Sequence, residues 1–199
     1  PGFAGMLDPD AKEAHGLFRK TFSLDHVPER VPARITADSR YGLYVNGHEL
    51  GHGPIRSQFR RLHYDTYDLA PYLKPGENVI AVYVKYYGKE KAFWMPAVPN
   101  RTLGKRGVMV FECDLGNNIW LISDDSWKAI RSDAWEHRSA DGRELAAEGV
   151  PVEIFDARRF PLAWKSADFD DTKWGKAQIV HAMLSGTYRS QPPTHPYGP

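Results

Sequence analysis

The chain has 199 residues, 42% of them hydrophobic, which suits one domain with a real buried core. Its 26 basic residues nearly balance its 25 acidic ones, so no overall field favours nucleic acid or an anionic membrane surface as a partner. No stretch approaches the roughly 18 consecutive apolar residues of a membrane span, and no signal peptide is visible. A secreted, a periplasmic and a cytoplasmic location therefore all stay open.

The first local signal in chain order is a short helical one at 8–15, and a second lies at 142–148. Every other periodic run is typical of a strand. The predicted strands are 17–24, 33–37, 40–45, 62–67, 79–86, 108–113, 119–123, 127–131, 152–155 and 177–183. We therefore expect an all-β domain over 17–183, a lead-in over 1–16 and an extended linker over 184–199. We expect this linker to continue into a further region of a longer protein, of which the chain is a fragment.

Turn residues support this segmentation. Asn46 and Gly47 both tolerate positive φ, so they predict a two-residue hairpin that returns through residues 48–50. Residues 75–78 (Pro-Gly-Glu-Asn) predict a tight turn into the apolar strand that follows. Within 40–45, alternation places Tyr41, Leu43 and Val45 on one face.

Cysteine and histidine offer little chemistry. Cys113 is the single cysteine, which excludes a disulfide within the chain, and its apolar run predicts a buried free thiol rather than a nucleophile. His48, His52 and His63 are the only local histidine group, and nothing in the spacing brings three ligands together.

The densest acidic cluster is Asp168, Asp170 and Asp171. It lacks the glycine and terminal glutamate of an EF-hand loop, so we interpret it as a solvated turn in which Asp171 or Thr172 caps. The Asp-Asp-Ser run before Trp127 receives the same interpretation, with Trp127 packed inward.

Several segments together resemble the N-terminal domain of bacterial α-L-rhamnosidases. They are 37–47 (ADSRYGLYVNG), 53–56 (GPIR), 64–82 (YDTYDLAPYLKPGENVIAV), 122–128 (ISDDSWK), 153–158 (EIFDAR) and 168–174 (DFDDTKW). The resemblance covers about residues 17–180 and extends more loosely to the sugar-binding jelly-roll of β-galactosidases. It implies a galactose-binding-like jelly-roll β-sandwich. It also implies a bacterial glycoside hydrolase whose acid and base carboxylates lie on a separate helical barrel, so this chain itself would be non-catalytic.

Sugar recognition needs an aromatic face and directional polar groups, commonly on loops at one end of a sandwich. If strand 40–45 leaves one end and 48–50 returns to it, residues 38–40, residues 53–60 and the loop 87–100 meet there. This end supplies the predicted sugar-binding set Asp38, Arg40, Arg56, Ser57, Gln58, Tyr87 and Trp94. The resemblance also implies a bound calcium, although the loop 56–61 contains no acid.

Two alternatives stay open within this set. Trp94 is either a stacking platform for a sugar ring or a covered core residue. Arg40 and Arg56 either bind sugar or, as we favour, hold loops through ion pairs and backbone carbonyls. Nearby basic residues suggest an acidic glycan, such as a rhamnose-uronate polysaccharide, as a further hypothesis. These are Arg56, Arg60, Arg61, Lys85, Lys89, Lys91, Arg101, Lys105 and Arg106.

Three functions compete. The favoured one is an accessory module that binds a rhamnose-containing oligo- or polysaccharide, next to the catalytic domain of its parent chain. The second is a structural domain that packs on the catalytic barrel and binds no sugar. The third, a β-sandwich lyase, is weakest because no motif brings His, Tyr and Arg together. None of the three involves nucleic acid or a membrane.

Overall fold

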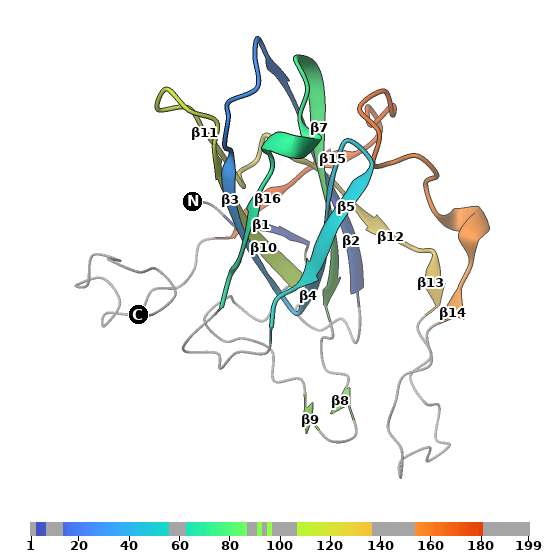
Figure 1. Cartoon of the computed structure of the whole chain (residues 1–199). Coiled ribbons are helices and arrows are strands. Elements are labelled where there is room, and N and C mark those ends of the chain that lie inside the picture. The colour runs from blue at the N-terminus through green and yellow to red at the C-terminus, as the bar shows by residue number, and fades with distance from the viewer. Residues whose placement is uncertain are drawn as a thin grey trace, which may run out of the picture.

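The computed structural model describes residues 3–6, 14–55, 63–86, 91–92, 95–96, 107–136 and 154–180. Two antiparallel sheets pack face to face (Figure 1). In spatial order the first sheet is β16 (Gln178–Val180), β1 (Phe3–Met6), β10 (Gly107–Asp114), β3 (Pro32–Asp38) and β6 (Asp65–Asp68), with β11 (Trp120–Ile122) paired to β10. The second is β15 (Gly175–Lys176), β12 (Lys128–Ser132), β2 (Ala14–Leu24), β7 (Gly76–Tyr86), β4 (Arg40–Val45) and β5 (His48–Gly53). The all-β sandwich that the sequence predicts is confirmed.

Smaller elements complete the described chain. Two short ladders pair β8 (Lys91–Ala92) with β9 (Met95–Pro96) and β13 (Trp135–Glu136) with β14 (Ile154–Phe155). Helix within the described ranges consists of the 3-10 turns η1 (Ala70–Tyr72) and η4 (Ala157–Arg159). No helix in these ranges has the length and apolar character to cross a membrane.

The prediction of a short helix over 8–15 is wrong at its last two residues, while residues 8–13 lie outside the described residues. Ala14 and His15 begin β2, and Ala14 lies opposite Tyr86 of β7. The pairing continues over the whole of both strands, which supplies hydrogen bonds that an isolated helical turn does not gain. Upstream, the expected lead-in contributes β1, which pairs with both β10 and β16. The second helical prediction, 142–148, lies outside the described residues.

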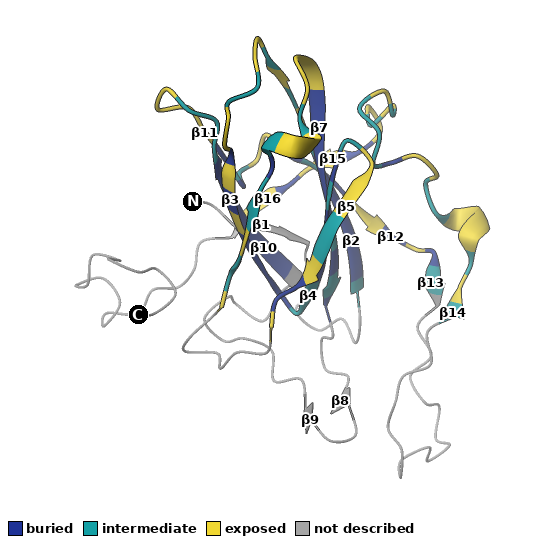
Figure 2. Cartoon of the chain, in the orientation of Figure 1, coloured by how far each residue is buried: buried dark blue, intermediate teal, exposed yellow. Residues whose placement is uncertain are grey.

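The core lies between the two sheets, where the strand centres are buried (Figure 2). Tyr41, Leu43 and Val45 of β4 all face it, as their alternation predicts. Cys113 is a free thiol buried in this core, and desolvation raises its pKa to about 12. The prediction of a buried free thiol is confirmed. Trp127 is also fully buried, and its Nε1 donates to the Ile122 carbonyl at 2.8 Å.

The predicted turns are confirmed by their dihedral angles. Asn46 and Gly47, with φ of 49° and 85°, connect β4 to β5 in a two-residue hairpin. Gly76, with φ of 86°, opens β7 after the Pro75 turn. These turns place the β4–β5 hairpin tip and the start of β7 at the same end of the second sheet.

A second layer covers the outer face of the second sheet. Trp164 and Trp174, from the segment that follows η4, pack on Leu17 of β2 and Ala81 of β7. This segment is drawn in orange in Figure 1. The sequence did not predict the layer, because its tryptophans stand in a turn-rich stretch without strand or helix periodicity.

Candidate functional site

The strand ends converge where the sequence predicted a shared end. Arg40 lies opposite Lys85 and Tyr41 opposite Gly53, so β4 begins where β5 and β7 finish. The backbone N–H of Ser39 donates to the Lys85 carbonyl at 3.0 Å, which ties the end of β3 to the end of β7. We call this region, at the foot of Figure 1, the loop end.

Two members of the predicted sugar-binding set are described at the loop end. Asp38, the last residue of β3, is 9% exposed, and Oδ1 of its carboxylate accepts a hydrogen bond from the Ser39 hydroxyl at 3.1 Å. Arg40, the first residue of β4, is half-buried and donates from Nη1 to the Pro54 carbonyl at 2.5 Å. This bond has the loop-holding geometry that we favoured for Arg40, and it uses one of the five N–H donors of the guanidinium.

A buried polar cluster forms the floor of the loop end. The Tyr41 hydroxyl donates to the Asp65 carboxylate and lies 3.0 Å from the Tyr67 hydroxyl. Burial, followed by these hydrogen bonds, raises the pKa of Tyr41, so its phenol stays neutral. The cluster joins β4 of the second sheet to β6 of the first. Gly53 is required beside it, because an added Cβ would collide with the Asp65 carboxylate and would stand 2.9 Å from the Tyr41 hydroxyl.

This cluster was not predicted from the sequence. The available signal was spacing, because Asp65 and Tyr67 stand two residues apart in a strand and so share one face.

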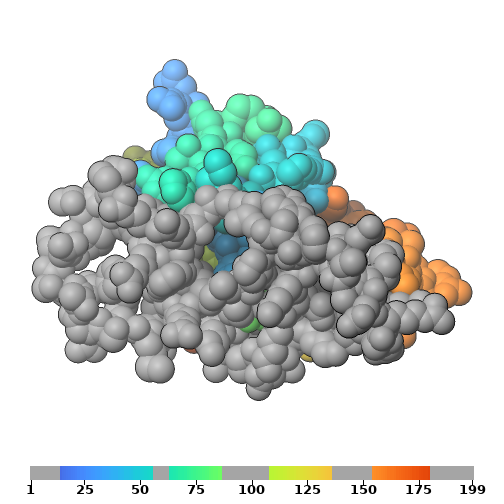
Figure 3. Space-filling model, turned by 90° about the horizontal axis from the view of Figure 1, so that it is seen from below, coloured from blue at the N-terminus to red at the C-terminus, as the bar shows by residue number. Residues whose placement is uncertain are grey.

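The remaining predicted residues, Arg56, Ser57, Gln58, Tyr87 and Trp94, lie outside the described residues. Ile55, which is 66% exposed, and Tyr86 are the last described residues before two of these segments. Seen from below (Figure 3), β5 in cyan and the neighbouring η1 region in green line one flank of the molecule. The rings of His48 and Tyr72, 5.9 Å apart, connect these two regions.

Within the described ranges, no three His, Cys, Asp or Glu side chains gather closely enough to hold a metal ion. The loop 56–61 is outside those ranges, so the calcium that the resemblance implies stays a prediction.

The acidic turn of 168–171 has a role that the sequence did not predict. Asp170 accepts a hydrogen bond from the Thr172 backbone N–H at 3.0 Å, as a turn residue does. Asp171, expected as a possible cap, instead accepts the Nε–H of buried Arg19 at 2.9 Å. The cluster therefore belongs to the second layer rather than to the loop end.

Comparison with known proteins gives consistent matches. A sequence model described as the α-L-rhamnosidase N-terminal domain matches residues 27–195. An α-L-rhamnosidase of Streptomyces avermitilis is 26% identical over 181 residues, which is 85% of this chain and 16% of that protein. One of Formosa agariphila is 25% identical over 190 residues, 89% of this chain and 19% of that protein. The chain thus spans less than a fifth of these relatives.

Solved structures agree on the fold. The GH78 rhamnosidase of Bacillus sp. GL1 superposes with a TM-score of 0.75 and 29% identity, covering 94% of this chain and 19% of that one. A lectin of Pleurotus ostreatus, solved in complex with GalNAc, has a TM-score of 0.56 and 23% identity, covering 91% of this chain and 42% of the lectin. At that identity the lectin supports a shared fold alone.

Proposed function

Because the chain belongs to the α-L-rhamnosidase N-terminal domain family, we propose that it is a non-catalytic accessory domain that binds rhamnose-containing glycan for an attached glycoside hydrolase. The proposed contact surface is the loop end, with Asp38, Arg40, Arg56, Ser57, Gln58, Tyr87 and Trp94 as its sugar-binding residues. The partners are the glycan and the catalytic domain of the parent chain.

The observation that carries the proposal is the convergence of strand ends. The described ends of β3, β5 and β7 lie together at one end of the sandwich, and the proposed residues stand at these ends or follow them in the sequence. Beside these strand ends, the hydrogen bond from Tyr41 to Asp65 links one sheet to the other. A rigid sandwich that presents polar and aromatic loop residues is a common arrangement for recognition.

The non-catalytic part of the proposal follows from the share of the relatives that the chain spans. The regions similar to this chain cover 16% and 19% of the two α-L-rhamnosidases, so most of each of those proteins has no counterpart in it. We assign the hydrolytic chemistry to that remainder.

Calorimetric titration of the 199-residue chain tests the proposal. L-Rhamnose and rhamnose-containing oligosaccharides are added in calcium and, separately, after treatment with a chelator. We expect binding heat that Trp94→Ala abolishes and that Trp120→Ala leaves unchanged. Trp120 is the matched control because it is 49% exposed and begins β11, away from the loop end. Binding that Trp94→Ala leaves intact would remove the loop end from the proposal.

A structural role is the second candidate, and two contacts favour it. Arg40 already holds the Pro54 carbonyl, and Asp38 is nearly buried beside Ser39. Both residues then shape the frame on which the parent's catalytic barrel would rest. An absence of heat with every sugar, in calcium and in chelator, would favour this role.

A further inference from the structure

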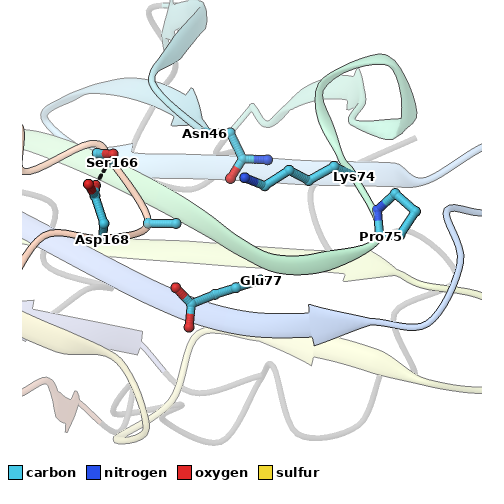
Figure 4. A pocket seen from close by; sticks show the side chains of 7 residues that line it. Asn46, Lys74, Pro75, Glu77, Ser166 and Asp168 are labelled. Atoms are coloured by element: carbon cyan, nitrogen blue, oxygen red, sulfur yellow. Dashed lines mark hydrogen bonds between the residues drawn. The ribbon is translucent and has the colours of Figure 1, made fainter.

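A hollow of about 470 Å³ lies at the end of the second sheet opposite the loop end. Three segments line it: the tip of the β4–β5 hairpin, the turn before β7 and the second layer. The lining residues are Asn46, Lys74, Pro75, Glu77, Ser166, Ala167 and Asp168 (Figure 4). The volume falls within the range of about 300–1,000 Å³ that small-molecule sites occupy.

A buried asparagine network holds two walls of the hollow. Asn78 is fully buried. Its Oδ1 accepts a hydrogen bond from the backbone N–H of Lys74 at 3.0 Å. Its Nδ2 donates to the Lys74 carbonyl at 2.7 Å and to the Gly76 carbonyl at 2.9 Å. Asn46 donates from its own amide to Asn78 Oδ1 at 2.8 Å. The hairpin tip and the turn are therefore fixed relative to each other.

A buried arginine holds the third wall. Arg19 is fully buried in β2 and reaches outward through the second layer. Its Nη1 donates to the Ser166 carbonyl at 2.8 Å and also to the Trp164 carbonyl. Its Nε–H pairs with Asp171 at 2.9 Å. The backbone of all three walls is thus held in place, so a ligand would not bear the entropy of ordering that backbone.

The polar groups of the hollow carry both signs of charge. Lys74 contributes an ammonium group, while Glu77 and Asp168 contribute carboxylates. In the described part of the chain, no ion pair links these three. The Ser166 hydroxyl donates to Asp168 and lowers the pKa of that carboxyl, and the nearby charge of Lys74 acts in the same direction. Asp168 is consequently ionised at neutral pH, and the three groups sum to one negative charge.

This pattern selects a class of ligand. Carboxylates only accept hydrogen bonds and an ammonium only donates them, so a ligand that satisfies both needs groups that do either. Hydroxyl groups meet that requirement without a charge. Glu77 and Asp168 would repel an anion, and Lys74 would repel a simple cation. Pro75 and Ala167 supply small apolar surfaces beside the polar groups.

We propose that this hollow is a second carbohydrate site, which binds a neutral saccharide through Lys74, Glu77 and Asp168. The inference goes beyond the proposed function, because it requires neither the loop end nor calcium. It predicts that the domain contacts glycan at two opposite ends.

Nuclear magnetic resonance titration of the ¹⁵N-labelled chain tests the site, with L-rhamnose and methyl α-L-rhamnopyranoside as probes. We expect concentration-dependent shifts at residues 74–78 and 166–169. Asp168→Asn should weaken binding about 10- to 100-fold, the loss expected for one hydrogen bond to a charged group. Asp170→Asn is the matched control, since Asp170 is an exposed carboxylate of the same turn that does not line the hollow.

Each result has a distinct meaning. Sugar-dependent shifts confined to residues 39–41 and 53–55 would overturn the second site and leave the proposed function standing. Shifts confined to the hollow would support the second site and contradict the proposed loop-end contact. If Asp168→Asn and Asp170→Asn weakened sugar binding equally, the inference would be overturned. It would also be overturned if the zwitterion glycine, but neither sugar, shifted the resonances of the hollow. Glu77→Gln provides a second exposed variant, expected to weaken binding to a similar degree.

Discussion

Replacing Arg19 by methionine tests whether the second layer depends on one buried guanidinium. The side chain of Arg19 is 0% exposed, and that of Asp171 is 19% exposed. Methionine keeps the aliphatic volume but removes the donors to Asp171 and to the carbonyls of Trp164, Ser166 and Phe169. The carboxylate and the carbonyls then stay in a largely water-free layer without a donor. Leaving these acceptors unsatisfied lowers the stability by more than the net contribution of the hydrogen bonds.

The expected loss follows from that geometry. Removing one member of a buried, hydrogen-bonded charge pair typically lowers the free energy of unfolding by about 3–5 kcal/mol. For a domain of this size, that loss corresponds to a melting temperature lower by roughly 6–20 °C. Because whole domains are stable by only about 5–15 kcal/mol, Arg19→Met would leave a marginal protein.

Urea unfolding followed by tryptophan fluorescence measures the change, since Trp164 and Trp174 belong to the layer itself. Arg131→Met is the matched control: Arg131 is exposed on β12 of the same sheet, and we expect a change within about 0.5 kcal/mol. Asp171→Asn should lower the free energy of unfolding less in the Arg19→Met background than in the native sequence, because Arg19→Met has already removed the ion pair. A loss below about 1 kcal/mol for Arg19→Met would refute the reasoning.

Three further predictions concern the sandwich itself. Gly53→Ala should lower the free energy of unfolding by about 1–3 kcal/mol, because its methyl group would crowd the Tyr41 hydroxyl; unchanged urea unfolding would contradict this. Cys113 should react with a thiol reagent only as fast as the chain unfolds, given its burial and a pKa of about 12; rapid labelling of the native chain at pH 8 would exclude that account. Two backbone N–H groups lower the pKa of Asp68, so its stabilising contribution is present above the unfolded pKa near 4 and is lost as pH falls through the lower folded value. Asp68→Asn should therefore show a shallower fall in stability below about pH 4 than the native sequence, and parallel acid denaturation curves would argue against it.

Local patterns in the sequence were sufficient for the strands and turns whose chemistry is local. Strand 40–45 was predicted with the bounds of β4, because period-two alternation needs only neighbouring residues. Asn46 and Gly47 define the hairpin because few other residues adopt positive φ at both positions. That residues 38–40 and 53 meet at one end was predicted from this hairpin, but the register was not: a shift between Leu43 and Tyr44 places Tyr41 opposite Gly53, and Arg40 pairs with Lys85 of β7.

Contacts between distant segments could not be predicted in this way. Arg19 donates to carbonyls 145 and 147 residues further along the chain, and nothing in its local sequence pattern indicates those partners. The partners of Asp65 and Asn78 are likewise set by the packing of one strand or turn on another. Periodicity says which face a side chain takes, but not what covers that face. The sequence by itself therefore determined the β-sandwich and its loop end, whereas only the tertiary structure decided the second layer and the hollow that Arg19 and Asn78 hold open.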